Sequence, residues 1–306
     1  MRQIVVLSGK GGTGKTSLTA ALAHLAFEEN ELVLADADVD AANLEILLKP
    51  ELMEEHSFEG GYKAEIDNDN CNGCGRCFDV CRYDAVIPPS PSQETSEYRI
   101  DRISCEGCNS CLYQCPVSAV SSHRAIAGKW FLSRSLYGPL FHAEMKAGEE
   151  NSGKLVTIVK NAAFGACEKA GCTLLIVDGP PGIGCPVIAA SAGADLAFIS
   201  TEPGVSAIHD LSRILGTVRH FGITPAVCIN RSDINSAKTT EIEAFCRAEN
   251  IILLGRIPYD DSVTIAMSKG MPVTAYDPET PASVAIREIW KILSALLQSS
   301  AFPELP

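Results

Sequence analysis

The chain has 306 residues, 46% of them hydrophobic, and a formal net charge of −13 with a pI near 4.9. The length allows one large and one small domain, and the acidic balance weighs against nucleic-acid binding, which usually needs a basic face, so we expect no nucleic-acid partner. No apolar run reaches the roughly 18 residues of a membrane span, so we expect no membrane association and a cytoplasmic protein.

The chain opens with a short apolar segment at 3–8 that leads into a Gly-rich turn and is typical of a buried parallel strand. The turn reads Gly9-Lys10-Gly11-Gly12-Thr13-Gly14-Lys15-Thr16, followed by Ser17, and matches the phosphate-binding pattern GxxxxGK[ST]. We expect a helix over 16–29 and a second strand over 31–35. Strand, phosphate loop, helix and strand in this order begin a parallel α/β domain.

The residue types of this loop suit nucleotide phosphates. Glycines let backbone N–H groups point at phosphate oxygens, and the following helix adds its positive N-terminal end. Lys15 should reach the β- and γ-phosphates, while Thr16 should give an oxygen to Mg²⁺. The alternative is a chance Gly-rich turn, which the flanking strand and helix argue against. The sequence therefore predicts ATP or ADP with Mg²⁺ as ligands.

A Cys-rich and turn-rich segment follows at about 61–124. It contains Cys71-x2-Cys74-x2-Cys77-x3-Cys81 and then Cys105-x2-Cys108-x2-Cys111-x3-Cys115-Pro116. This spacing, used twice, is the bacterial ferredoxin pattern for two 4Fe–4S clusters, in which the fourth cysteine of each run ligates the other cluster. We therefore expect one cluster on Cys71, Cys74, Cys77 and Cys115, and the other on Cys81, Cys105, Cys108 and Cys111.

Zinc is the competing interpretation of the cysteines, because it also binds CxxC pairs. The continuous run of four cysteines, repeated, favours iron–sulfur clusters. Arg82 stands where the second run has Pro116, and its charge could raise a cluster's reduction potential by favouring the more negative reduced state. The organisation that we predict is a ferredoxin-like domain at 61–124, inserted into a larger domain made of 1–60 and 125–306.

After the insert, Trp130-Phe131-Leu132 and Leu155–Val159 predict two strands, with a polar turn at 152–154 between them. Further strands are expected at 173–177, 196–201, 225–229 and 251–257, and helices at 187–193, 205–221, 236–249 and 282–297. Each of these strands ends at a polar motif, as expected for ligand binding at the carboxyl ends of an open parallel sheet. The predicted fold class is α/β: a P-loop nucleoside triphosphatase whose mainly parallel sheet is covered by helices on both faces, plus a small inserted α+β ferredoxin.

A resemblance to a known class rests on Lys10, just after the first glycine of the loop, and on Asp36-Ala37-Asp38, Asn43-Leu44 and Asp178-Gly179-Pro180-Pro181-Gly182. Outside the insert the chain resembles the deviant P-loop ATPases of the MinD/ParA/Mrp and nitrogenase-iron-protein class. With the insert, it looks like the MinD-superfamily ATPases that contain a ferredoxin domain. The resemblance implies a homodimer, or a heterodimer with a similar ATPase, in which Lys10 reaches the partner's nucleotide.

The resemblance also implies roles for the acidic motifs. Asp38 would orient or activate the attacking water, and Asp36 would lie beside the Mg²⁺ shell. Asp178 would bind Mg²⁺ through water, and Gly179 and Gly182 would supply a mobile switch backbone. Helix capping is the alternative for such an acidic run.

In relatives, positions matching Asn230, Arg231 and Pro258 contact adenine, although an ordinary loop is the alternative here. Cys185 follows the second switch motif, where the nitrogenase iron protein has a cysteine that helps hold a cluster shared between subunits. By this resemblance Cys185 could hold a shared or transient cluster; the alternative is a buried small residue at a helix start.

Three functions are compatible with these features. The first, which we prefer, is ATP-dependent assembly or transfer of iron–sulfur or metal clusters to an acceptor metalloprotein. The second is a low-potential electron donor gated by ATP and acting on a redox partner. The third is a nucleotide-dependent interaction or positioning protein whose clusters are structural or sensory. All three require an ATPase with Lys10, Lys15 and Asp38 in its catalytic machinery.

Overall fold

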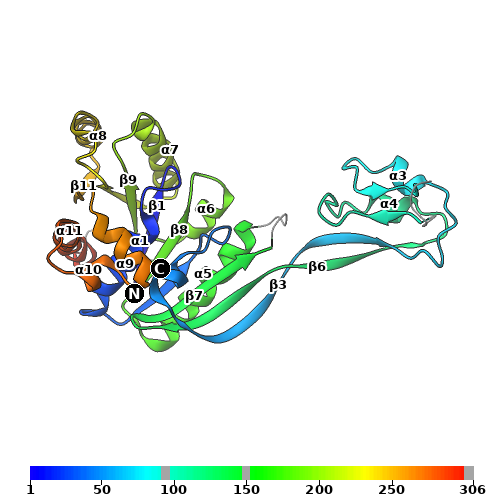
Figure 1. Ribbon diagram of the computed structural model, residues 1–306, viewed down its shortest axis with the longest axis horizontal. Helices are drawn as coiled ribbons and strands as arrows, with labels where there is room; N and C mark the ends of the chain where they lie inside the picture. Colours follow the sequence, from blue (N-terminus) through cyan, green and yellow to red (C-terminus); the bar gives the residue numbers. More distant parts are fainter. Residues whose placement is uncertain (91–96, 147–151, 300–306) are drawn as a thin grey trace. The chain divides into compact units, whose positions relative to one another are not determined.

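The computed structural model describes residues 1–90, 97–146 and 152–299 (Figure 1). The chain forms two compact units. The first contains Met1–His56, Trp130–Glu144 and the chain from Ser152 onward, and the second consists mainly of Ser57–Lys129. Among the described residues, no helix combines the length and the apolar character needed to cross a membrane.

A nine-stranded sheet with the order β11-β10-β9-β1-β8-β2-β7-β6-β3 forms the centre of the first unit. All the pairings from β11 through β7 are parallel, as the sequence predicts. Strands β3 and β6 begin in one unit and continue into the other. The strands are β1 (Arg2–Ser8), β2 (Leu32–Asp36), β3 (Glu51–Ile66), β6 (Val120–Ser135), β7 (Gly138–Met145), β8 (Leu174–Pro181), β9 (Leu196–Thr201), β10 (Thr224–Ile229) and β11 (Ile252–Arg256).

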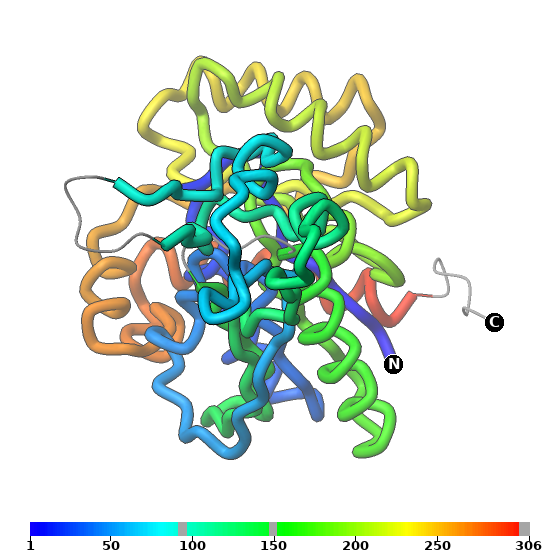
Figure 2. Tube along the Cα trace, turned by 90° about the vertical axis from the view of Figure 1, so that its right-hand side faces the viewer, coloured from blue at the N-terminus to red at the C-terminus, as the bar shows by residue number. Residues whose placement is uncertain are grey.

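Helices cover both faces of this sheet, because alternate side chains of its central strands are buried on either side. Helices α1 and α11 pack on one face, α5, α6 and α7 contact the sheet as well, and α7 and α8 lie side by side (Figures 1 and 2). The helices are α1 (Lys15–Phe27), α2 (Leu44–Leu48), α5 (Ser152–Ala170), α6 (Cys185–Ser191), α7 (Ala207–His220), α8 (Ser236–Ala248), α9 (Asp261–Lys269), α10 (Val273–Tyr276) and α11 (Pro281–Gln298).

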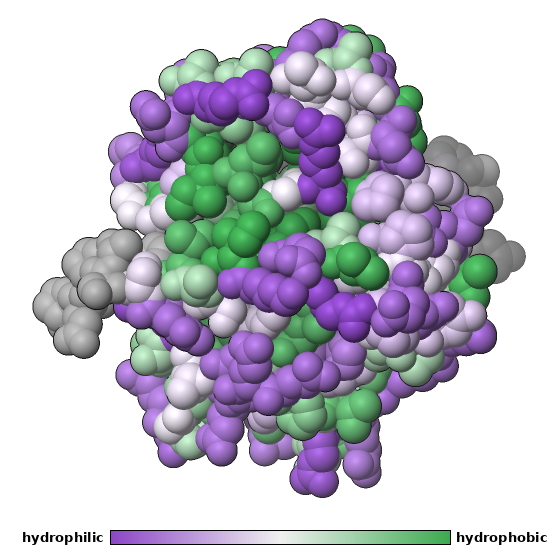
Figure 3. Space-filling model, turned by 90° about the vertical axis from the view of Figure 1, so that its left-hand side faces the viewer, coloured by the Kyte–Doolittle hydropathy of each residue, from purple (hydrophilic) through white to green (hydrophobic). Residues whose placement is uncertain are grey.

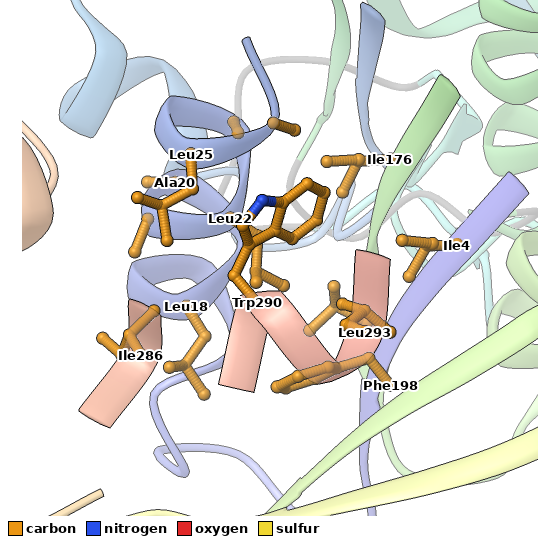
Figure 4. Close-up of a cluster of buried hydrophobic side chains, with 14 of the residues drawn as sticks. Ile4, Leu18, Ala20, Leu22, Leu25, Ile176, Phe198, Ile286, Trp290 and Leu293 are labelled. Carbon is orange, nitrogen blue, oxygen red and sulfur yellow. The ribbon is translucent and has the colours of Figure 1, made fainter. Parts of the chain in front are cut away.

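The main hydrophobic core lies between α1, α11 and the sheet. Figure 4 shows Trp290 and Leu293 of α11 among side chains of α1 and of three strands, which include Ile4, Ile176 and Phe198. Burial of each such large apolar side chain is worth roughly 1.5–3 kcal/mol. Apolar side chains also remain at the surface of this region: Val284 and Ile292 of α11 are exposed, and Figure 3 shows hydrophobic side chains gathered on the face where β11 and α11 lie.

The second unit repeats one local structure. Each cysteine run places its third cysteine on a short helix, α3 (Arg76–Asp79) or α4 (Ser110–Gln114), and the residue before each helix, Gly75 or Asn109, is left-handed. Strands β4 (Val86–Ile87) and β5 (Arg99–Ile100) pair antiparallel. A small core of Ala64, Ala85, Cys105 and Val120 holds the unit together.

One predicted strand is wrong. The segment 155–159 lies in α5, and the predicted turn at 152–154 forms the first residues of that helix. The buried residues Leu155, Val159 and Ala163 recur at the spacing of one helix face, so tertiary packing outweighs the β-propensity of the local Val-Thr-Ile-Val run. The strand predicted at Trp130–Leu132 is confirmed as part of β6.

Candidate functional site

The phosphate-binding loop joins β1 to α1 and is tied to the neighbouring strands. Gly12 and Gly14 have φ values of 81° and 84°, which only glycine adopts at little cost. The carbonyl oxygen of Thr13 accepts hydrogen bonds from Ser200 Oγ at 2.8 Å and from Asn230 Nδ2 at 2.9 Å. These two donors stand at the carboxyl ends of β9 and β10, so the loop conformation is fixed by the sheet.

Asn230 also packs its side-chain amide on the loop; its expected contact with adenine stays a prediction. A Cβ atom on Gly14 would lie 2.5 Å from Asn230 Nδ2, so this contact requires glycine at position 14. Lys15, only 6% exposed, begins α1 directly after Gly14. Its ammonium and the free N–H groups of the helix start provide the positive potential that phosphates need.

Two buried carboxylates, Asp36 and Asp178, pair in register on the adjacent strands β2 and β8: Asp36 is the last residue of β2, and Asp178 lies within β8. Asp36 accepts N–H bonds from Asp38, Asn43 and Leu44 at 3.0–3.2 Å. Burial, reinforced by the charge of Asp178, nevertheless raises the pKa of Asp36 well above its usual range. Two carboxylates this close and this deeply buried favour a cation between them and the nucleotide.

One carboxylate oxygen of Asp178 has no hydrogen-bond partner. Its Oδ1 accepts a hydrogen bond from Thr19 Oγ1 at 2.8 Å, while its Oδ2 is buried and has no hydrogen-bond partner. Burial raises its pKa to about 6, against the opposing effects of Thr16, Thr19 and Lys15. Mg²⁺ is usually held by one or two carboxylates together with substrate phosphates and waters, and Asp178 with the Thr16 hydroxyl fits that need.

Asp38 lies close to the same groups. Burial raises the pKa of its carboxyl, and the nearby Lys15 ammonium opposes the rise. The predicted role of Asp38 toward the attacking water stays a prediction; its proximity to Lys15 is compatible with a position near the γ-phosphate.

A cavity of about 550 Å³, partly open to solvent, adjoins the loop. Apolar side chains, among them Leu18, Val263 and Ile286, form part of its wall. The predicted adenine contacts Asn230, Arg231 and Pro258 all line it, as does Ser17, whose hydroxyl donates to Met267 Sδ at 3.2 Å. The loop residue Gly14 lines it as well, together with residues that the sequence analysis missed: Leu18, Ile257, Tyr259, Asp260, Val263, Thr264, Met267, Val273 and Ile286.

Most of these missed residues come from α9 and the chain around it, a helix that the sequence analysis did not predict. Its start had a signal in the sequence: Asp260 precedes the helix and its Oδ1 accepts a hydrogen bond from Ser262 N at 2.9 Å, as an N-cap does.

The second switch motif begins within a strand. Strand β8 continues through Pro181, so Gly179 lies within a strand, where an added Cβ would come within 2.8 Å of Val6 O. Gly182 follows with φ of 90° and donates its N–H to Ser8 O at 3.0 Å. Cys185, the first residue of α6, is exposed rather than buried.

The second unit brings the cysteines together in two groups of four. One cavity is lined by Cys71, Cys74, Cys77 and Cys115, and another by Cys81, Cys105, Cys108 and Cys111. Each group thus combines three cysteines of one run with the fourth of the other run. Within the described part of the chain, however, no group of three or more Cys, His, Asp or Glu side chains is positioned to hold a metal ion.

The thiols differ in their surroundings. Burial raises the pKa of Cys77 and of Cys111, whereas the Ser110 hydroxyl, aided by the charge of Arg82, lowers the pKa of the exposed Cys108. The positive charge of Arg82 therefore acts on a thiol of the cavity that Cys81 lines together with Cys105, Cys108 and Cys111. Cys115 Sγ accepts an N–H bond from Ala119 at 3.2 Å.

Comparison with known proteins gives consistent matches. The family model described as the CobQ/CobB/MinD/ParA nucleotide binding domain matches residues 4–273. An uncharacterised protein of Methanocaldococcus jannaschii is 34% identical over 76% of this chain and 79% of its own. The septum site-determining protein MinD of Bacillus subtilis is 27% identical over 94% of this chain and 86% of its own. The solved structure of MinD with Mg-ADP from Pyrococcus horikoshii has a TM-score of 0.59 at 17% identity, covering 97% of each chain, and so shares the fold.

Proposed function

We propose that this chain, which belongs to the CobQ/CobB/MinD/ParA nucleotide-binding family and is an ATPase, uses its nucleotide cycle to assemble or transfer iron–sulfur or metal clusters. The proposal includes a ferredoxin-like domain at 61–124 that carries two 4Fe–4S clusters. It also includes a homodimer, or a heterodimer with a similar ATPase, formed across the nucleotide site, and an acceptor metalloprotein.

One observation carries the cluster part of this proposal. Each of two cavities is lined by four cysteines, and each set takes its fourth cysteine from the other run. That exchange is the one used by two-cluster ferredoxins. Disulfide formation would have no reason to sort eight cysteines in this way, and zinc does not require the exchange. Tetrathiolate ligation is the chemistry that this donor set suits.

The nucleotide part rests on the geometry of the loop and on the two buried carboxylates. Lys15 and Thr16 would meet the phosphates and Mg²⁺, and Asp178 has the unpartnered oxygen that a magnesium-bound water would satisfy. Lys10 differs from Lys15: 37% of its side chain is exposed, so a second subunit could reach it. Dimerisation through Lys10 follows from this difference together with the family resemblance.

The proposal predicts that nucleotide hydrolysis drives cluster release. Anaerobically purified holoprotein would be mixed with a ferrous-iron chelator, and iron release would be followed with MgATP and with MgADP. MgATP should accelerate release in the wild type and in Lys238→Ala, which alters an exposed lysine on α8, but not in Lys15→Ala. Equal rates with both nucleotides in the wild type would contradict a transfer function.

An ATP-gated electron donor is the second candidate, and the exposure of one thiol in each set, Cys74 and Cys108, favours it. An exposed ligand shortens the path for electrons to a docked partner. Under this function, MgATP should shift the cluster potential by about 59 mV or more, which corresponds to roughly 1.4 kcal/mol of coupling for one electron. The shift should occur without faster iron release.

A positioning function is the third candidate, favoured by the similarity to proteins named for septum-site determination. In that function the clusters would be structural or sensory. Cys→Ser changes in the insert should then alter the binding of a partner protein. Under this function, MgATP should neither accelerate iron release nor shift the cluster potential, so the changes would remove neither effect.

A further inference from the structure

Glu202 occupies a central place beside the phosphate-binding loop. It directly follows β9, which lies between β1 and β10 in the sheet, so it stands between the loop and the chain that follows β10. Its two carboxylate oxygens are used separately: Oε1 lies 3.0 Å from Lys10 Nζ, and Oε2 lies 3.3 Å from Arg231 Nη1. Only 17% of its side chain is exposed, so water screens these contacts incompletely.

The surrounding backbone holds Lys10 in this position. Ser8 Oγ donates to the carbonyl oxygen of Lys10 at 2.6 Å. Gly204 N donates to Glu202 O at 2.7 Å in a tight turn, and a Cβ on Gly204 would lie 3.3 Å from Lys10 Nζ. The turn thus places the Glu202 carboxylate and Gly204, which has no side chain, next to the Lys10 ammonium group.

Arg231 is held on the other side. It has a φ of 50°, which is uncommon for a residue with a side chain, and its guanidinium also lies 3.4 Å from the carbonyl oxygen of Gly12. Glu202 therefore connects two cations from different loops, both beside the place where the nucleotide phosphates would bind. If Lys10 left, Arg231 would still neutralise the half-buried carboxylate, so the release of Lys10 need not leave an unpaired charge.

We infer that Glu202 is a positioning residue that holds Lys10 within its own subunit and so sets how readily Lys10 becomes available to a partner's nucleotide. The inference rests on the proposed dimer, in which Lys10 meets the phosphates of the second subunit. Lys10 cannot stay on Glu202 and also reach across an interface, so the two anions compete for it. The contact would restrain dimerisation until the partner's nucleotide outweighs it.

The first test measures the contact itself. Nucleotide-free protein would be treated with an amine-acetylating reagent, and the modification of each lysine quantified by mass spectrometry. Glu202→Gln should raise the reactivity of Lys10 and leave that of the buried Lys15 unchanged, since a general loosening of the fold would expose both. Glu249→Gln is the matched control, because Glu249, just after α8, pairs with Arg219 in the last turn of α7. Unchanged reactivity of Lys10 in Glu202→Gln would overturn the inference.

The second test measures the consequence by sedimentation of the monomer and dimer with a slowly hydrolysed MgATP analogue. Because partly exposed ion pairs contribute modestly, Glu202→Gln should lower the dimer dissociation constant about two- to fivefold, and Glu202→Asp less. An unchanged constant, with Lys10→Ala unable to dimerise, would overturn the role of Glu202 while the proposed dimer survives. Normal dimerisation of Lys10→Ala would instead contradict the proposed dimer itself.

Discussion

The stability of the first unit should fall in acid because of His142, a residue to which the sequence assigns no role. This histidine of β7 is only 5% exposed. Its Nε2 lies 2.9 Å from Ser133 Oγ on β6, and its Nδ1 lies 3.0 Å from Glu45 Oε2 on α2. Burial lowers the pKa of His142 to about 4. The side chain of Glu45 is 45% exposed, so water screens its charge.

The sign and size of the effect follow from linkage. An unfolded histidine takes up its proton near pH 6.5, whereas His142 in the folded protein does so only near pH 4. Acidification from about pH 6.5 to 4 therefore favours the unfolded state, and the contribution is constant above that window. The loss from this one group should reach roughly 2 kcal/mol by pH 5 and roughly 3 kcal/mol when complete, a large part of a typical stability of about 5–15 kcal/mol.

The assay is urea unfolding, followed by circular dichroism, at several pH values from 7.5 to about 4.5. The wild type should lose about 2 kcal/mol more than His142→Gln between pH 7 and pH 5. Comparison with the variant removes the contributions of other groups, such as Asp36 and Asp178, whose raised pKa values act in the opposite direction. His209→Gln, at an exposed histidine, should follow the wild-type curve.

Two results would refute this reasoning. Parallel curves for the wild type and His142→Gln would show that His142 titrates alike in both states. A wild type that gains stability relative to the variant in acid would show that a charged His142–Glu45 pair dominates.

Three further predictions concern the loop and the core. Gly14→Ala should weaken nucleotide binding more than tenfold in a fluorescent-ATP titration, because position 14 has a φ of 84° and the added Cβ would meet Asn230. The control Gly11→Ala has open space at its Cβ and should bind nucleotide nearly normally. Equal affinities of the two variants would refute the contact. Lys15→Ala should abolish MgATP binding by calorimetry, and retained tight binding would sink the phosphate-site assignment. Trp290→Ala should cost about 3–5 kcal/mol in chemical denaturation because the ring is 4% exposed, and a loss below about 1 kcal/mol would contradict its place in the core.

The nucleotide half of the protein was well predicted from the sequence, because its signals are local. One stretch of about 25 residues contains the apolar strand at 3–8, the glycines of the loop and the helix after it, and this order is the signature of a phosphate-binding unit. The structure has β1, the loop and α1 at these positions. Asp36 and Asp178 were expected to act together, and their register on β2 and β8 brings them side by side.

The parts that sequence reasoning missed depend on contacts between distant residues. Strands β3 and β6 are each 16 residues long, but β3 is exposed along most of its length and shows no regular alternation of buried residues. Its pairing with a distant strand cannot be derived from a period of two. Glu202 was also missed, because an acidic residue after a strand has no special meaning until Lys10 and Arg231 are seen on either side of it.

The central claim is that this ATPase carries two four-iron clusters on exchanged sets of cysteines. Iron and acid-labile sulfide analysis of anaerobically purified protein, with EPR of the dithionite-reduced form, tests it most directly. We expect about eight iron and about eight sulfide per chain, with the spectrum of two interacting reduced clusters, and Cys115→Ser should impair the cluster of the first run rather than the second. Zinc in place of iron, or Cys115→Ser damaging only the cluster of its own run, would contradict the claim.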